Sequence, residues 1–204
     1  MKKISFLIFL VVFIATWIKP IWVYEQSLHS SLTIIALMVL WFYHKKYAIN
    51  ERDFALMMLF LTLHTVAGYW LYSNVPYERW SQSLFGVSLN EFLGWERNNF
   101  DRLIHLFYGI CITPFIISHF SNVKKVEKKT AFWIAIGLIV ITSVIYEWLE
   151  WLVAISLSPH DAEAYNGQQG DMWDAHKDML LATLGGMVWY FKSKASDKTF
   201  TEND

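Results

Sequence analysis

Apolar residues gather in six stretches of the chain, separated by polar and aromatic segments. A helix needs roughly 20 mainly apolar residues to cross a bilayer, and the backbone of a spanning segment must satisfy its hydrogen bonds internally. The pattern therefore predicts an all-α polytopic membrane helix bundle with about six transmembrane helices. The predicted spans are residues 4–18 (with an extension to 24 left open), 28–43, 54–73, 103–120, 131–153 and 179–191.

These spans make up one predicted transmembrane domain over residues 1–192, followed by a polar cytoplasmic tail over 193–204. The Met-Lys-Lys start and the apolar run after it also fit a signal peptide. Trp17 and Pro20, however, stand where small residues would mark a cleavage site. We therefore expect the first span to be retained.

Basic residues predict the orientation, because cytoplasmic loops of membrane proteins carry an excess of Lys and Arg. Placing both termini in the cytoplasm puts 12 of the 17 basic residues on the inner side. It also leaves two long outer loops, 74–101 and 154–178, and loops of that length are usually functional. The inner basic residues are Lys2, Lys3, Lys45, Lys46, Arg52, Lys124, Lys125, Lys128, Lys129, Lys192, Lys194 and Lys198.

Composition supports a membrane location and excludes other classes of protein. Of the 204 residues, 55% are hydrophobic and 17% are charged, against about 25% charged in a typical soluble domain. The net charge of −1, without a basic stripe, excludes a nucleic-acid partner. Cys111 is the only cysteine, which excludes an intramolecular disulfide and a cysteine-rich zinc site. The first expected partner is therefore the lipid bilayer.

Asp101 and His105 form a first candidate pair, at the outer entrance of the fourth predicted span. Their i, i+4 spacing places both side chains on one helix face. A carboxylate that orients an imidazole is a common arrangement for a general base or a metal ligand. The structural alternative is that Asp101 caps the helix while His105 packs at the membrane interface.

Glu147 and Glu150 lie in the outer third of the fifth predicted span. A charge at the bilayer centre costs at least ~3 kcal/mol, and intramembrane acids are functional by default. Two facing carboxylates repel, so either one is protonated or both share a cation. The structural alternative is a bond to a neighbouring Arg or Trp. His64, in the middle of the third span, is a packing residue unless it faces this cluster.

Asp171, Asp174 and Asp178 are spaced i, i+3 and i+7 before the last predicted span. They share one face if the helix already begins near Asp171. Acids in a first helical turn also suit the helix dipole, which is the structural alternative. His176 and Lys177 are expected to be bystanders.

All these acids belong to the outer ends of the last three spans, and consecutive antiparallel helices are usually neighbours. Carboxylate-rich sites without cysteine favour Mg, Ca or Mn, or Zn if a histidine joins, and protons are the other candidate. Arg79, Arg97 and Arg102 could instead anchor an anionic head group or phosphate. The candidate metal ligands are Asp101, His105, Glu147, Glu150, Asp171, Asp174 and Asp178.

Several of these motifs together resemble the YjdF-type bacterial inner-membrane proteins, over about residues 56–186. The resemblance implies a multi-pass protein of the bacterial cytoplasmic membrane and no particular reaction. That family tends to carry a His where this chain has Asn99. A looser, topological similarity is to VanZ-like membrane proteins. The motifs are Leu63-His64, Tyr72-Ser73-x-Val75-Pro76, Asn98-Asn99-Phe100-Asp101-Arg102-Leu103-Ile104-His105, Tyr146-Glu147-x-x-Glu150-Trp151 and Gln169-Gly170-Asp171-x-Trp173-Asp174-x-x-x-Asp178-Met179.

Four functions stay open at this point. The acidic site binds a divalent cation or an anionic lipid-linked ligand, or it serves a small ion- or proton-coupled transporter or channel. It could also belong to a metal-assisted membrane enzyme, with metal-bound water as nucleophile, Glu147 or His105 as base and Arg102 as anion clamp. Finally, it could be the polar network of a structural accessory subunit. The sequence predicts neither the oligomeric state nor the metal.

Overall fold

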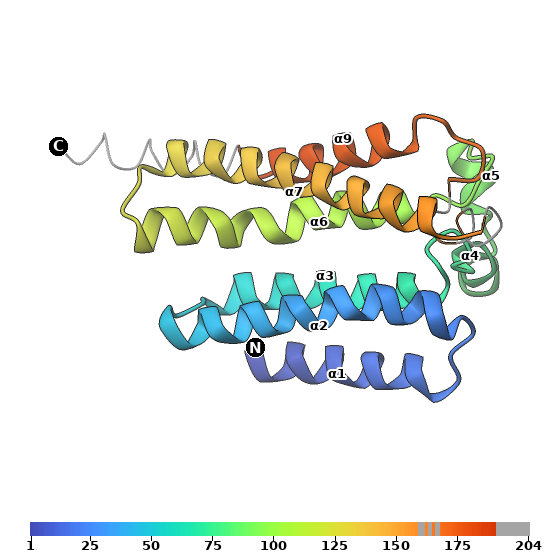
Figure 1. Cartoon of the computed structure of the whole chain (residues 1–204), viewed down its shortest axis with the longest axis horizontal. Helices are drawn as coiled ribbons and strands as arrows, with labels where there is room; N and C mark the ends of the chain where they lie inside the picture. The colour runs from blue at the N-terminus through green and yellow to red at the C-terminus, as the bar shows by residue number, and fades with distance from the viewer. Residues whose placement is uncertain (159–161, 163–164, 166–167, 191–204) are drawn as a thin grey trace.

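The computed structural model describes residues 1–158, 162, 165 and 168–190, and this part of the chain contains helices and no strand. Six long helices run side by side along one axis, and two short ones lie at one end of the bundle (Figure 1). The long helices are α1 (Lys2–Ile18), α2 (Val23–Lys46), α3 (Glu51–Tyr69), α6 (Phe100–Ser118), α7 (Lys128–Ser156) and α9 (Asp174–Met187), and the short ones are α4 (Tyr77–Phe85) and α5 (Leu89–Leu93).

Three of the described helices are long and apolar enough to cross a membrane by length and composition. They are α2, α7 and the continuous helix Phe100–Val123, in which the π-helix η1 (His119–Val123) extends α6. The prediction of an all-helical membrane protein is therefore confirmed at this level.

Helix ends differ from the predicted spans where turn geometry decides. The first helix ends at Ile18 and the next begins at Val23, so the extension of the first span to residue 24 was wrong. The third helix ends at Tyr69, because Leu71 and Tyr72 adopt positive φ angles of 48° and 56°. The last helix begins at Asp174, five residues before the predicted span, and position 191 lies outside the described residues.

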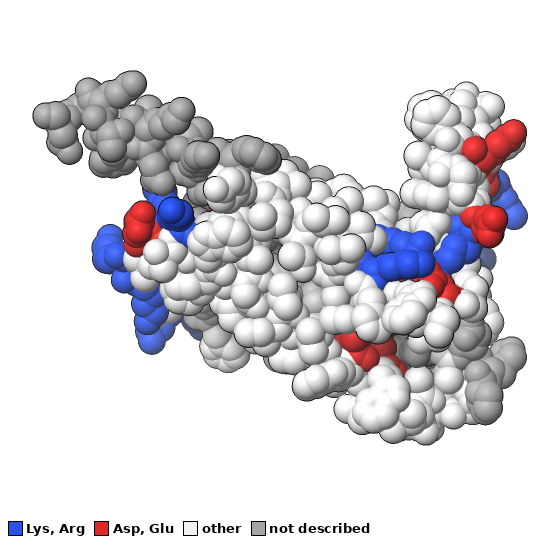
Figure 2. Space-filling view, turned by 90° about the horizontal axis from the view of Figure 1, so that it is seen from above, with Lys and Arg blue, Asp and Glu red and all other residues white. Residues whose placement is uncertain are grey.

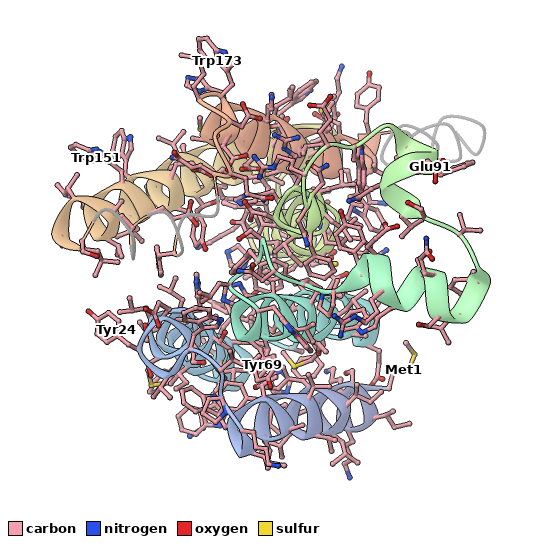
Figure 3. The ribbon with its side chains drawn as sticks, turned by 90° about the vertical axis from the view of Figure 1, so that its right-hand side faces the viewer. Met1, Tyr24, Tyr69, Glu91, Trp151 and Trp173 are labelled. Carbon is pink, nitrogen blue, oxygen red and sulfur yellow. The ribbon has the colours of Figure 1, made fainter. Side chains whose placement is uncertain are left out.

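The bundle consists of two three-helix units that meet through α3 and α6. In the first unit α3 packs against α1 and α2, and in the second α6, α7 and α9 all pack against one another. Figure 3, seen along the helices, shows α3 and α6 at the centre. The core of the first unit contains Phe9, Met57, Met58 and Leu61, all at most 6% exposed.

Glycines bring α6 and α9 into backbone contact. A Cβ added to Gly109 of α6 would lie 1.9 Å from the carbonyl oxygen of Ala182, and one added to Gly185 would lie 2.1 Å from that of Leu106. Small residues allow this close approach of helices in membranes. The contact sets the first turns of α9, which carry Asp178, against the first turns of α6, which carry Asp101 and His105.

Pro114 interrupts the hydrogen-bond ladder of α6, and Trp189, two residues after the end of α9, supplies the missing donor. Proline has no N–H, so it cannot donate to the carbonyl four residues earlier, which belongs to Ile110. The indole Nε1 of Trp189 donates to that oxygen at 2.8 Å instead. A freed carbonyl in a spanning helix needs such a partner, so the contact also fixes the C-terminal end of α9 against α6.

The two ends of the bundle are polar and its middle is apolar. Figure 2 shows the Lys, Arg, Asp and Glu side chains of one face gathered toward the two ends, with an uncharged zone between them. At the end opposite α4 and α5, the Tyr43 hydroxyl and the His119 Nδ1 lie 2.7 Å apart and join the two units. Asp53 is fully buried there, paired with Arg52 at 2.7 Å.

Candidate functional site

Asp101, His105 and Asp178 form a buried cluster in the first turns of α6 and α9, at the end of the bundle where α4 and α5 lie (Figure 1). The His105 Nε2 lies 3.4 Å from the Asp101 Oδ1, as the i, i+4 spacing on α6 requires. One potential ligand atom from each of the three residues lies within 4.8 Å of the other two. The three residues are 6%, 7% and 2% exposed, respectively. Such a group can hold a metal ion, since carboxylate oxygens and an imidazole nitrogen are common ligands.

Glu147 and Glu150 approach this cluster from α7. Glu147 lies within electrostatic range of His105, Asp101 and Asp174, and Glu150 lies within range of Asp101, Glu147 and His105. Both glutamate side chains are half-buried. The structure thus brings together the predicted acids of three helices.

Two carboxylate oxygens of this cluster lack a hydrogen-bond partner among the described residues. They are the Oδ1 of Asp178 and the Oε1 of Glu147, and both are buried. A buried polar atom without a partner costs free energy, and a carboxylate has no proton to donate when it is ionised. The two oxygens therefore need a cation or a proton from outside this part of the chain.

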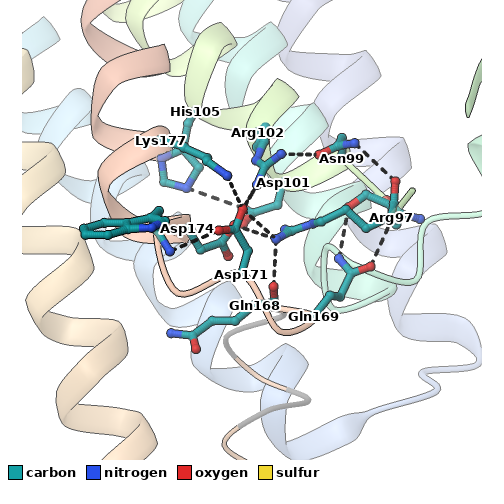
Figure 4. Close-up of polar contacts among 12 residues, drawn as sticks. Arg97, Asn99, Asp101, Arg102, His105, Gln168, Gln169, Asp171, Asp174 and Lys177 are labelled. Atoms are coloured by element: carbon teal, nitrogen blue, oxygen red, sulfur yellow. Dashed lines mark hydrogen bonds and ion pairs between the residues drawn. The ribbon is translucent and has the colours of Figure 1, made fainter. Parts of the chain in front are cut away.

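A second, outer layer of charge lies next to the cluster and is balanced by ion pairs (Figure 4). The Arg97 Nη1 lies 2.7 Å from the Asp174 Oδ1. Asp171 pairs with Arg102 and, at 2.5 Å, with the Nζ of Lys177. The hydrogen bond from Lys177, with help from the Trp173 N–H, lowers the pKa of Asp171 to about 2. Asp171 is therefore ionised and forms ion pairs with the basic side chains of Arg102 and Lys177.

This outer layer corrects two expectations about the last helix. Asp171 does not share a face of α9 with Asp174 and Asp178, because it lies in the turn before the helix, where its Oδ1 accepts a hydrogen bond from the Trp173 N–H at 3.0 Å. Lys177 is not a bystander, because it binds Asp171. His176 contacts the ring of Trp173.

The two layers differ in their charge balance. The outer layer places two carboxylates, Asp171 and Asp174, against three cations. Among the residues described, the inner layer sets four carboxylates against one imidazole. These are Asp101, Glu147, Glu150 and Asp178 around His105. Like charges held this close cannot all stay ionised without a compensating cation.

Hydrogen bonds of side chains join the segment before α6 to the segment before α9 and hold the arginines in place. Asn98 and Gln169 bind each other twice, since the Asn98 N–H donates to Gln169 Oε1 at 3.1 Å and the Gln169 amide donates to the Asn98 carbonyl at 3.0 Å. Arg97 also donates to the Gln168 carbonyl at 2.7 Å. The Asn99 Oδ1 accepts a hydrogen bond from the Arg102 Nη1 at 2.8 Å. Asn99 therefore orients an arginine and is not a member of the inner cluster.

A cavity of about 220 Å³ lies between the two units, beside the inner cluster. His105 and Tyr146 line it on one side and His64 and Tyr72 on the other. His64 binds the Tyr72 hydroxyl and lies 3.3 Å from the His29 carbonyl oxygen. His64 is therefore no member of the acidic cluster, and it faces the same cavity as His105.

Sequence reasoning missed the polar rings behind this cavity. His29 of α2 is 2% exposed, and Tyr165 stacks on it with ring centroids 4.7 Å apart. His29 carried the same signal as His64, a polar ring inside an apolar span. Tyr165 carried no such signal in the sequence, because only the fold brings it against His29 of α2. Among the described residues, no ion pair or hydrogen bond joins Arg79 to the cluster.

These features define a class: an integral membrane helix bundle with a buried acidic centre near one end. The chain belongs to the DUF2238 family of predicted membrane proteins, whose family model matches residues 1–195. It is also similar to the inner membrane protein YjdF of Escherichia coli (strain K12), with 29% identity over 174 residues, which cover 79% of this chain and 78% of that protein. No solved structure matches the chain. The resemblance and the inner-membrane location expected from the sequence are thereby confirmed.

Proposed function

We propose that this protein binds a divalent cation at Asp101, His105, Glu147 and Asp178, in a site that opens to the outer side of the membrane. The single observation that carries the proposal is the Oδ1 of Asp178. This oxygen is buried and lacks a partner among the described residues, yet its side chain lies beside Asp101 and His105. A divalent cation bound there would offset two of the four carboxylate charges of the inner layer and supply the missing partner.

The proposed topology has six spans with both termini in the cytoplasm. It rests on the excess of Lys and Arg at the predicted inner loops. The short helices α4 and α5 would then lie at the outer interface, where their exposed apolar side chains Leu84, Phe85 and Phe92 (74–76% exposed) would enter the lipid. The acidic centre would face the periplasmic side.

Zinc and manganese fit the proposed ligands better than magnesium and calcium. Mg and Ca prefer sites made of oxygen ligands alone, whereas an imidazole with carboxylates suits Zn or Mn. Asp101 has a double role in this proposal, because it both offers an oxygen and holds the imidazole of His105. Arg97 and Arg102 are not ligands and serve to neutralise Asp174 and Asp171.

A metal-assisted membrane enzyme is the second candidate function. The cavity beside His105 supports it, because a substrate held there would face the proposed metal. The unpartnered Glu147 Oε1 is then placed to act as a general base toward metal-bound water. Incubation of the purified protein with a bacterial lipid extract tests this role. An enzyme should convert a lipid of the extract to a new product, and a chelator should abolish this conversion. The transporter and the structural subunit stay predictions from the sequence.

Thermal unfolding of the full chain in detergent, with and without added cation, tests the proposed function. Zn or Mn at 100 times its Kd would stabilise the folded protein by about 2.7 kcal/mol, because only the folded chain presents the site. Asp178→Asn should remove this stabilisation. Asp171→Asn, the same change in the outer layer, should keep it. A chelator-treated wild type that none of Zn, Mn, Mg and Ca stabilises would contradict the proposal.

A further inference from the structure

The cavity between the two units has mainly apolar walls. Leu32 and Ala36 of α2, Phe60 and Leu61 of α3, and Ile104 of α6 contribute most of them. Its volume of about 220 Å³ exceeds the ~150 Å³ of an engineered apolar cavity that takes up benzene. The cavity is therefore large enough for part of a hydrocarbon chain.

The cavity opens sideways, between α2 and α7, toward the lipid-facing surface. Among its lining residues, Ala36 of α2 and Thr142 of α7 are exposed. Tyr24 of α2 and Trp151 of α7 lie on the same side of the molecule in Figure 3, and both helices lie in front of α3 and α6 in Figure 1. Exposed apolar side chains flank the opening: Ile34, Ile35 and Val39 on α2, and Ile141 and Ile145 on α7. A molecule that enters here comes from the bilayer.

The order of residues along the helices places the cavity deeper in the membrane than the acidic centre. On α6, Ile104 and Tyr108 line the cavity, whereas Asp101 lies nearer the outer end. On α7, which runs in the opposite direction, Thr142 and Tyr146 line the cavity and precede Glu147. A lipid of the outer leaflet has the same order, with its head group outward and its chain inward.

Polar groups without partners mark the side of the cavity next to the acidic centre. The Ser143 Oγ lines the cavity, is buried, and has no hydrogen-bond partner within the described part of the chain. The Arg102 Nε, on α6 one helical turn before His105, is a second buried atom without such a partner, although Arg102 does not line the cavity. Hydroxyl and guanidinium donors suit the oxygens of an anionic head group.

We propose that the cavity holds an acyl chain of an anionic phospholipid, which enters between α2 and α7 and places its phosphate at the acidic centre. The position of the chain rests on the cavity alone. The position of the phosphate rests on the proposed function, because the bound cation would coordinate a phosphate oxygen that the carboxylates alone would repel. A second copy of the protein is a poor occupant, since the cavity is too small for a helix.

Photocrosslinking in vesicles tests this proposal with the full chain. The protein is reconstituted into phosphatidylethanolamine and phosphatidylglycerol with a trace of phosphatidylglycerol carrying a diazirine on its acyl chain, and the labelled residues are mapped by mass spectrometry. We expect label at Ala36, Tyr108 and Thr142, above the level on the lipid-facing residue Ile141. Label spread evenly over the exposed faces of α2 and α7 of the wild-type protein would overturn the proposal.

Two variants separate cavity binding from general contact with lipid. Ser143→Phe fills the cavity and should lower its label about tenfold, because the aromatic ring would occupy the space of the acyl chain. Ala36→Phe blocks the exposed opening of the cavity without changing a buried residue, and it should also lower the label in the cavity about tenfold. Ile141→Phe is the matched control on the lipid face of α7 and should leave the label unchanged. Unaltered label in both cavity variants would overturn the proposal.

Metal content and a second probe separate the two proposals. If the wild type is labelled in the cavity but binds no metal, the proposed cation site and the proposed position of the phosphate are both rejected. The proposal that an acyl chain occupies the cavity would then stand. If the wild type binds metal but is not labelled in the cavity, the proposed binding of a lipid is rejected and the proposed cation site stands. The same diazirine on phosphatidylcholine, which has no net charge, should label the cavity several-fold less than phosphatidylglycerol if the head group is recognised. Equal label by both lipids would overturn that recognition.

Discussion

Gly185 of α9 lies so close to Leu106 of α6 that a Cβ on the glycine would meet the leucine carbonyl oxygen at 2.1 Å. No side chain can give way there, because the atom it would meet belongs to the backbone. The distance between the two helices is therefore set by the absence of a side chain. The same distance brings Asp178 to His105, so the packing of the glycine and the acidic centre depend on each other.

Gly185→Ala should push α9 away from α6. We expect a loss of about 1–3 kcal/mol in stability, the usual cost of overpacking, together with weaker metal binding. Gly137→Ala on α7 is the matched control, since nothing lies within 4 Å of the position that its methyl group would take and alanine favours a helix by about 0.5–1 kcal/mol. Thermal unfolding in detergent measures both, and equal melting temperatures for the two variants would contradict this account.

The ion pair between Arg97 and Asp174 should be strongly coupled. Both side chains are largely buried, at 13% and 5% exposed, and removing one partner of a buried pair costs about 3–5 kcal/mol. Arg97→Gln and Asp174→Asn should therefore each destabilise the protein, while the double variant should lose about 0.5–3 kcal/mol less than the sum of the two. A strictly additive double-mutant cycle would show that the pair makes no net contribution.

Asp171 should make the stability of the outer loop depend on pH in acid. Its pKa in the folded protein is lowered to about 2 from 3.8, so folding favours the ionised form. The stabilisation is present above the unfolded pKa and is lost as the pH falls from about 4 to about 2. The melting temperature of the wild type should exceed that of Asp171→Asn at neutral pH, and the difference should shrink in this acid range. A difference that is constant from pH 7 to 2 would rule out the ionised pair.

The proposed topology predicts which surface residues react from outside the membrane. Cys111 is fully buried, so the background of a thiol reagent is low. In spheroplasts, a membrane-impermeant maleimide should label Glu96→Cys in the outer loop and leave Lys124→Cys in the inner loop unlabelled. Permeabilisation should expose both. The reverse pattern would invert the orientation that the basic loops predict.

Local patterns in the sequence were enough to predict the pair Asp101 and His105 and to single out Glu147, which lies near them in the structure. The i, i+4 spacing acts within one helix, and the depth of an acid can be read along an apolar span. Gly109 and Gly185 also carried a usable signal, since small residues mark helix contacts in membranes.

The rest of the site depended on contacts that no local pattern contains. The ion pair of Lys177 with Asp171 depends on the turn before α9, which leaves Asp171 outside the helix. The cavity beside His105 arises where α2, α3, α6 and α7 meet. Tertiary packing decides such features, and hydropathy fixes neither tilt nor packing order.

Metal content tests the central claim most directly. The wild type, purified without added chelator and analysed for Zn, Mn, Mg and Ca, should contain about one divalent ion per chain, as expected for a single three- or four-ligand site. Asp178→Asn should contain almost none, and Asp171→Asn should match the wild type. Metal-free wild type that stays folded and takes up no added cation would contradict the claim that Asp101, His105 and Asp178 form a metal centre.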